Sequence, residues 1–144
     1  MDYTELAKRF LYNARQFRKC GYHKKIDRSI QGETFALLFI SGRSGAILPN
    51  EISDEMNISS ARVAAMLNNL EDKGLISREV DSTDRRRVLV SLTPEGREIA
   101  NQHRQNSIRA IARMLESLGE HDAKEYVRIM GRLADIIPHI SLDG

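Results

Sequence analysis

The chain has 144 residues, of which 41% are hydrophobic and 29% charged, which suits one compact domain and excludes a disordered chain. Its net charge of +2 is only mildly basic, so a nucleic-acid partner must be indicated by local charge. We recognise neither a secretion signal nor a membrane span, and the single cysteine, Cys20, excludes an intramolecular disulfide and a cysteine-based metal cage. We therefore expect a cytoplasmic protein.

The first part of the chain predicts three helices. Apolar residues at helical spacing predict the first from about Tyr3 to Cys20. A second, mostly apolar helix can start at Ser29 or Gln31 and ends near Gly42. A third is expected over Ile47 to Met56.

The fourth predicted helix has clear signals at both ends. Ser59 is a good N-cap, because its hydroxyl can accept from the free N–H groups of the first turn. At the other end, Gly74 can take the left-handed conformation, and Leu75 is placed to close back onto Leu70. Two short helices joined by a tight turn make a helix-turn-helix.

The fourth helix has two different faces. Val63, Leu67 and Leu70 form a stripe that we expect to be buried, whereas the opposite side is small or hydrogen-bonding and has no carboxylate before Glu71. Such a face can approach base-pair edges without repelling phosphates. The candidates for reading bases on this face are Ser60, Arg62, Met66 and Asn69.

A hairpin with a basic tip follows. From Leu75 to Thr93 the hydrophobic period changes to two, which predicts two strands around a turn at Asp81 to Asp84. The next three residues, Arg85 to Arg87, repel one another unless something anionic receives them. A phosphate or a minor groove, whose negative potential attracts arginine, fits that requirement. Asp84 would order the tip by pairing with a neighbouring arginine.

The last third of the chain predicts two more helices. The first begins over Thr93 to Gly96 and ends at Gly119, and the second runs from about His121 to just before Pro138. Together with the N-terminal helix, they carry apolar stripes that a small core cannot cover. Pairing with a second copy of the chain is the simplest way to bury these stripes.

The chain resembles the MarR family of winged-helix transcriptional regulators. The resemblance covers nearly the whole chain, and the motifs that carry it are Gly74 to Arg78 (G-L-I-x-R), Asp84-Arg85-Arg86, Leu92-Thr93 and Gly96, preceded by Glu51-Ile52-Ser53 and Ile58-Ser59. It implies a mainly α fold with a small β-hairpin wing (α+β), in which a winged helix-turn-helix sits on a helical dimerisation base. It also implies an obligate homodimer that binds double-stranded DNA at a pseudo-palindromic operator, usually as a repressor.

The resemblance assigns parts to the chain. Residues 1–28 and 97–144 would form the dimerisation region, and 29–96 the DNA-binding region of one compact chain. The recognition helix falls on Ser59 to Lys73, where the four candidates above would face the major groove. In the wing, Asp84 takes the acidic position, Arg86 enters the minor groove, and Arg85 and Arg87 hold phosphates. Leu48 stands where a capping Ser or Thr is common, which leaves the start of that helix open by a residue or two.

The signal that would control such a regulator is not defined by the residues. Some family members respond to an oxidant through a cysteine, but Cys20 lies later than the sensing position, which favours a structural thiol. Others release DNA on binding a small aromatic anion, and no residue here identifies such a small-molecule effector. The four histidines are neither close in sequence nor accompanied by cysteines, so we predict no metal site and no cofactor.

Of two other functions, one is compatible with the sequence. A winged helix can serve as a protein-interaction module without sequence-specific DNA binding, and this is the alternative to a regulator. An enzyme is not expected, because no Gly-rich phosphate loop, paired catalytic carboxylates or nucleophile with a recognisable base appears.

Overall fold

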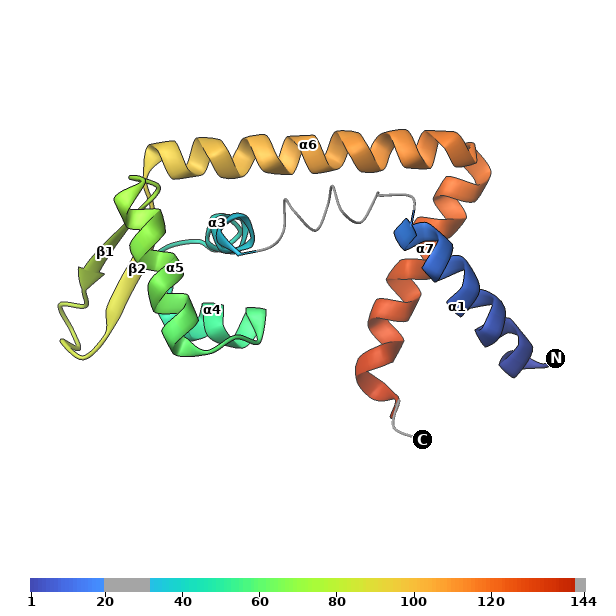
Figure 1. Cartoon of the computed structure of the whole chain (residues 1–144), viewed down its shortest axis with the longest axis horizontal. Coiled ribbons are helices and arrows are strands. Elements are labelled where there is room, and N and C mark those ends of the chain that lie inside the picture. Colours follow the sequence, from blue (N-terminus) through green and yellow to red (C-terminus); the bar gives the residue numbers. More distant parts are fainter. Residues whose placement is uncertain (20–31, 142–144) are drawn as a thin grey trace. The chain divides into compact units, whose positions relative to one another are not determined.

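The computed structural model describes residues 1–19 and 32–141 (Figure 1). It confirms the predicted fold class, a mainly helical chain with one antiparallel hairpin. In chain order the elements are α1 (Tyr3–Lys19), α3 (Glu33–Ser41), α4 (Pro49–Met56), α5 (Ser60–Asp72), β1 (Ile76–Val80), β2 (Val88–Leu92), α6 (Pro94–Leu118), α7 (Glu120–Ile136) and a 3-10 turn (Ile137–His139). The chain divides into two compact units, Met1–Arg104 and Gln105–Gly144.

The first unit contains a hydrophobic core built from α3, α4, α5, the hairpin and the start of α6. The predicted stripe of α5 lies at its centre, since Val63, Leu67 and Leu70 are at most 1% exposed. Ile52 from α4 and Val90 from β2 are fully buried with them. The core therefore holds the helix-turn-helix and the hairpin together as one body.

Both ends of α5 are formed as predicted. The N–H of Arg62 donates to the hydroxyl of Ser59 at 3.2 Å, which makes Ser59 the N-cap. Gly74 has φ 73°, and the N–H of Leu75 donates to the carbonyl of Leu70 at 3.0 Å. These local contacts fix where α5 begins and ends.

The hairpin pairs Ile76 with Leu92 and Val80 with Val88. Ile47 adds a short third segment, because it exchanges two backbone hydrogen bonds with Val90, at 2.9 and 2.8 Å. The prediction of a helix from Ile47 is therefore wrong, and α4 begins at Pro49. The physical reason is that a proline pushes the residue before it into an extended conformation, which Leu48 adopts.

The start of α6 is a close junction with the end of α5. The Thr93 hydroxyl accepts from the N–H of Gly96 at 3.1 Å and donates to the carbonyl of Gly74 at 2.6 Å. A Cβ on Gly96 would lie 1.9 Å from the carbonyl oxygen of Leu75, so only glycine fits there. The predicted helix start at Thr93 to Gly96 is confirmed.

The other predicted boundaries are met in part. α1 begins at Tyr3, but Cys20, where we expected it to end, lies outside the described residues. The same holds for Ser29 and Gln31, whereas the described part of the second helix begins at Glu33. α7 ends before Pro138 as predicted, although a 3-10 turn continues through that proline.

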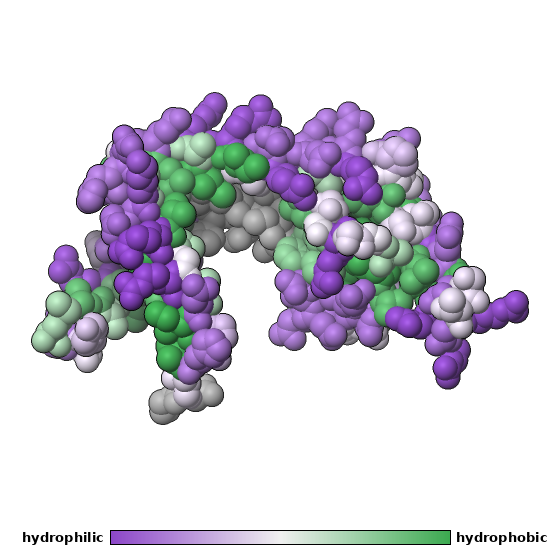
Figure 2. Space-filling view, turned by 180° about the vertical axis from the view of Figure 1, so that it is seen from behind, coloured by the Kyte–Doolittle hydropathy of each residue, from purple (hydrophilic) through white to green (hydrophobic). Residues whose placement is uncertain are grey.

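The terminal helices keep their apolar side chains at the surface. No residue of α1 or α7 is buried, and Figure 2 shows hydrophobic residues exposed along α7. Phe10 of α1 is 68% exposed, and Met130 and Leu133 of α7 are 52% and 48% exposed. Over the described residues, no helix has the length and apolar character that a membrane crossing requires.

Candidate nucleic-acid interface

Three of the four base-reading candidates lie on the exposed face of α5, namely Ser60, Arg62 and Asn69. The prediction that Met66 lies on this face is wrong, because its side chain is only 8% exposed and belongs to the core. Met66 follows Val63 by three residues and precedes Leu70 by four, so helix geometry places it on the buried stripe. The outer face is therefore smaller and more polar than expected.

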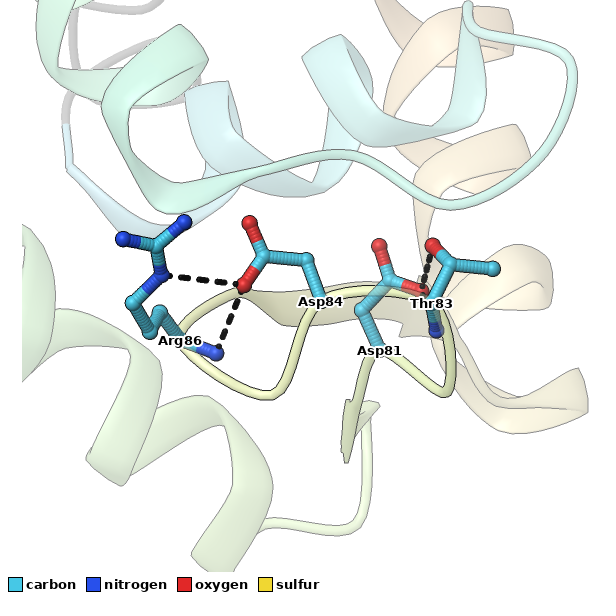
Figure 3. A network of polar contacts seen from close by, with 4 residues as sticks. All are labelled: Asp81, Thr83, Asp84 and Arg86. Carbon is cyan, nitrogen blue, oxygen red and sulfur yellow. Dashed lines mark hydrogen bonds and ion pairs between the residues drawn. The ribbon is translucent and has the colours of Figure 1, made fainter.

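The wing tip is organised around Asp84 (Figure 3). Its Oδ1 accepts from the backbone N–H of Arg86 at 3.1 Å and from the Arg86 Nε at 3.2 Å, while its carbonyl accepts from the N–H of Arg87 at 3.0 Å. The expected pairing of Asp84 with a neighbouring arginine is thus present, and Arg86 is its partner. The Arg86 side chain is nevertheless 91% exposed, which leaves its terminal nitrogens open to an acceptor from outside.

A second carboxylate orders the other side of the tip. Asp81 Oδ1 accepts from the N–H of Thr83 at 2.9 Å and from its hydroxyl at 2.8 Å (Figure 3). These hydrogen bonds lower the pKa of Asp81 below its ordinary value, and the one from the backbone N–H of Thr83 has the larger effect. Sequence reasoning treated Asp81 only as a turn residue and did not foresee this role.

The remaining wing arginines, Arg85 and Arg87, are exposed. Arg86 and Arg87 also line an open groove between the wing and the start of α4, together with Asn50 and Val88. The wing arginines and the exposed face of α5 both belong to the unit Met1–Arg104. One body therefore carries every predicted contact residue.

A network between α5 and β1 was not foreseen from the sequence. The Nε and Nη2 of Arg78 donate to the two carboxylate oxygens of Glu71 at 3.1 and 3.2 Å, and Nη2 also donates to Asn68 Oδ1 at 2.7 Å. The hydrogen bond from Arg78 lowers the pKa of Glu71, and the same bond raises that of Arg78, so both remain ionised at neutral pH. The G-L-I-x-R motif contains this arginine, but its partner depends on how the strand packs on the helix.

Among residues 1–19 and 32–141, no three His, Cys, Asp or Glu side chains lie close enough together to hold a metal ion.

Comparison with known proteins identifies the family. A family model described as the MarR family matches residues 29–87. The chain is 34% identical over 108 residues to the HTH-type transcriptional repressor MdtR of Bacillus subtilis, covering 72% of this chain and 69% of MdtR. It is also 27% identical over 126 residues to the uncharacterised HTH-type transcriptional regulator YwhA of the same organism, covering 88% of each.

Comparison with solved structures finds the same fold. The crystal structure of Streptococcus pneumoniae FabT in complex with DNA superposes with a TM-score of 0.72 at 21% identity, covering 97% of this chain and all of that one. The sequence relatives are named as transcriptional regulators and not as enzymes. The chain belongs to the MarR family of DNA-binding transcriptional regulators.

Proposed function

We propose that this protein is a homodimeric repressor that binds a pseudo-palindromic operator, with α5 in the major groove and the wing in the minor groove. The observation that carries the proposal is the wing tip, where Asp84 holds one highly exposed arginine between two others. Three guanidinium groups in sequence gain free energy when a polyanion receives them. A minor groove supplies both the negative potential and the narrow shape.

The exposed face of α5 supports the second part of the proposal. Ser60, Arg62 and Asn69 can hydrogen-bond to base edges, and the first carboxylate of the helix, Glu71, is paired with Arg78. Met66 has no part in base reading, because it is buried. Arg86 is assigned to the minor groove, and its neighbours Arg85 and Arg87 are assigned to backbone phosphates.

The exposed apolar stripes of α1 and α7 support a dimer. Side chains such as Phe10, Met130 and Leu133 would be removed from water by a second copy. A two-fold dimer explains why the operator would be pseudo-palindromic, with half-sites about one helical turn apart. The assignment as a repressor is supported by the relative MdtR, which is named a repressor.

The test is binding to DNA from the promoter of its own gene. We expect tight, sequence-dependent binding whose affinity falls steeply as salt is raised, because phosphate contacts release counterions. Arg86→Ala should weaken this binding by about tenfold or more, while the dimer seen by sedimentation is retained. Arg132→Ala removes an exposed arginine of α7 and serves as the matched control, with unchanged affinity expected.

Two results would contradict the proposal. One is binding that is absent at low salt or survives high salt unchanged. The other is a wing whose three arginines can be neutralised with no effect on DNA binding but with loss of a protein partner, which would instead support a protein-interaction module.

A further inference from the structure

We propose that Arg78 is a positioning residue of the DNA-binding site, which fixes α5 relative to the wing so that both can engage one duplex at once. This inference rests on the proposed function. Arg78 itself makes no base or phosphate contact in this proposal.

The geometry of Arg78 suits that role. Its backbone lies in β1 opposite the fully buried Val90, so its Cα is anchored in the core. Its guanidinium reaches Asn68 and Glu71, which lie one turn apart on the same side of α5. A planar fork that meets both oxygens of a carboxylate fixes direction as well as distance.

The contacts of Arg78 distinguish it from the wing-tip arginines. Its side chain is only 27% exposed, whereas that of Arg86 is 91% exposed. Two of its three nitrogens, Nε and Nη2, are already engaged within the protein. The residue is therefore arranged to hold protein elements together, and little of its hydrogen-bonding capacity is left for DNA.

The hydrogen bonds of Arg78 also differ from the ion pair that Lys73 makes at the end of α5. The Nζ of Lys73 donates to a carboxylate oxygen of Glu33 at 2.6 Å, which ties α5 to α3 and not to the wing. Arg78 is thus the side chain that joins the recognition helix to a wing strand by hydrogen bonds, among those the structure describes. Its loss would leave the hydrophobic core alone to set the relative orientation of α5 and the wing.

The energetic consequence follows from how linked contacts add. When α5 and the wing are held rigidly, their relative orientation is already fixed during folding. DNA binding then loses little conformational entropy, and the contacts of both elements contribute fully to affinity. When they are loosely joined, the wing must be ordered at the moment of binding, and Arg86 contributes less. Neutralising Glu71 through Arg78 also removes an uncompensated negative charge from the helix that would lie in the groove.

The experiment is a thermodynamic cycle on DNA affinity with four full-length proteins: the natural chain, Arg86→Ala, Arg78→Gln and the double variant. We expect Arg78→Gln alone to weaken binding by about three- to tenfold, and the penalty of Arg86→Ala to be at least about threefold smaller in the Arg78→Gln background. A purely structural loss would lower the active fraction equally with and without Arg86, so it would leave that penalty unchanged.

Two further variants sharpen the test. Arg78→Lys keeps the charge but loses the fork, and should reduce the Arg86 penalty as the glutamine variant does. Arg128→Gln breaks a bidentate pair with Glu125 of the same kind in α7, at 3.0 and 2.8 Å, and should leave the Arg86 penalty as it is in the natural chain.

An unchanged Arg86 penalty in the Arg78→Gln background would overturn the inference. The inference would also be overturned if the plot of log affinity against log salt became less steep by about one in Arg78→Gln, since that would make Arg78 a phosphate contact. If the natural chain fails to bind promoter DNA, it is the proposed function that fails. If it binds and depends on Arg86 but not on this coupling, only the role of Arg78 is rejected.

Discussion

The helix-turn-helix region and the terminal helices differ in how far their apolar side chains are buried. In the first, Leu67 and Leu70 are almost completely buried by neighbours from the same chain. In the second, Met130 and Leu133 belong to an equally regular stripe, but each side chain is about half exposed. The core of the first region is formed within one chain, whereas the apolar side chains of the second stay exposed and are the surface that the proposed dimer would bury.

The largest expected effect comes from placing a charge in the second region. Met130→Glu would put an unpaired carboxylate into each copy's proposed contact surface, which costs several kcal/mol per ion when water is excluded. We expect dissociation into monomers by sedimentation and an operator affinity lower by at least about 100-fold, because avidity is lost. Arg132→Glu is the control on the other side of α7 and should remain dimeric. A dimeric Met130→Glu protein would show that this stripe is not the contact surface.

The next effect should appear in the first region. Leu67→Ala leaves a cavity beside fully packed neighbours and should lower the free energy of unfolding by about 2–5 kcal/mol. Because Leu67 is 1% exposed within one chain, this loss should not depend on protein concentration in thermal melts. Leu133→Ala should instead destabilise the protein in a concentration-dependent way. Equal behaviour of the two variants would remove the distinction between the regions.

Glycines offer a third comparison. A Cβ at Gly96 would collide with backbone atoms of Leu75, whereas a Cβ at Gly131 in α7 would meet nothing within 4 Å. Gly96→Ala should therefore cost about 1–3 kcal/mol or more, as overpacking does, measured by urea unfolding. Gly131→Ala should be neutral or stabilising by up to about 1 kcal/mol, because alanine favours the helix. A destabilised Gly131→Ala dimer would mean that this part of α7 approaches its partner closely.

The smallest effect concerns the wing tip, which hydrogen bonds hold in place of apolar packing. The pKa of Asp81 is lowered in the folded chain, so its stabilisation is present at neutral pH and is lost as the pH falls below about 4. Asp81→Asn should reduce the difference between the melting temperatures at pH 7 and pH 3. Glu79→Gln, an exposed carboxylate of the same hairpin, is the control. An identical acid dependence in Asp81→Asn and the natural chain would contradict this account.

The features that could be predicted from the sequence are those set by neighbours along the chain. Ser59 as a cap and Gly74 as a helix end depend on a few adjacent residues, and both were identified correctly. The pairing of Asp84 with Arg86, two residues away, is of the same local kind. Local physics was sufficient in each case.

The face of α5 that carries Met66 was predicted wrongly, and two contacts between segments distant in sequence were not predicted. Met66 was assigned to the outer face although its spacing from Val63 and Leu70 already placed it with the core, so this error was one of interpretation. The bridge between Ile47 and Val90 and the contact of Arg78 with Glu71 join segments whose meeting depends on tertiary packing. No spacing rule along the chain contains that information.

The Thr93 hydroxyl has a mechanical consequence. Its two hydrogen bonds link Gly74, the residue after the C-cap of α5, to Gly96 in the first turn of α6, so a tilt of α6 at this point would be passed on to the end of α5. With 25 residues, α6 is roughly 37 Å long. For a straight helix of this length, a sideways shift of about 3 Å at its C-terminal end corresponds to a rotation of about 5° at Thr93, so a large movement at one end requires only a small change at the other.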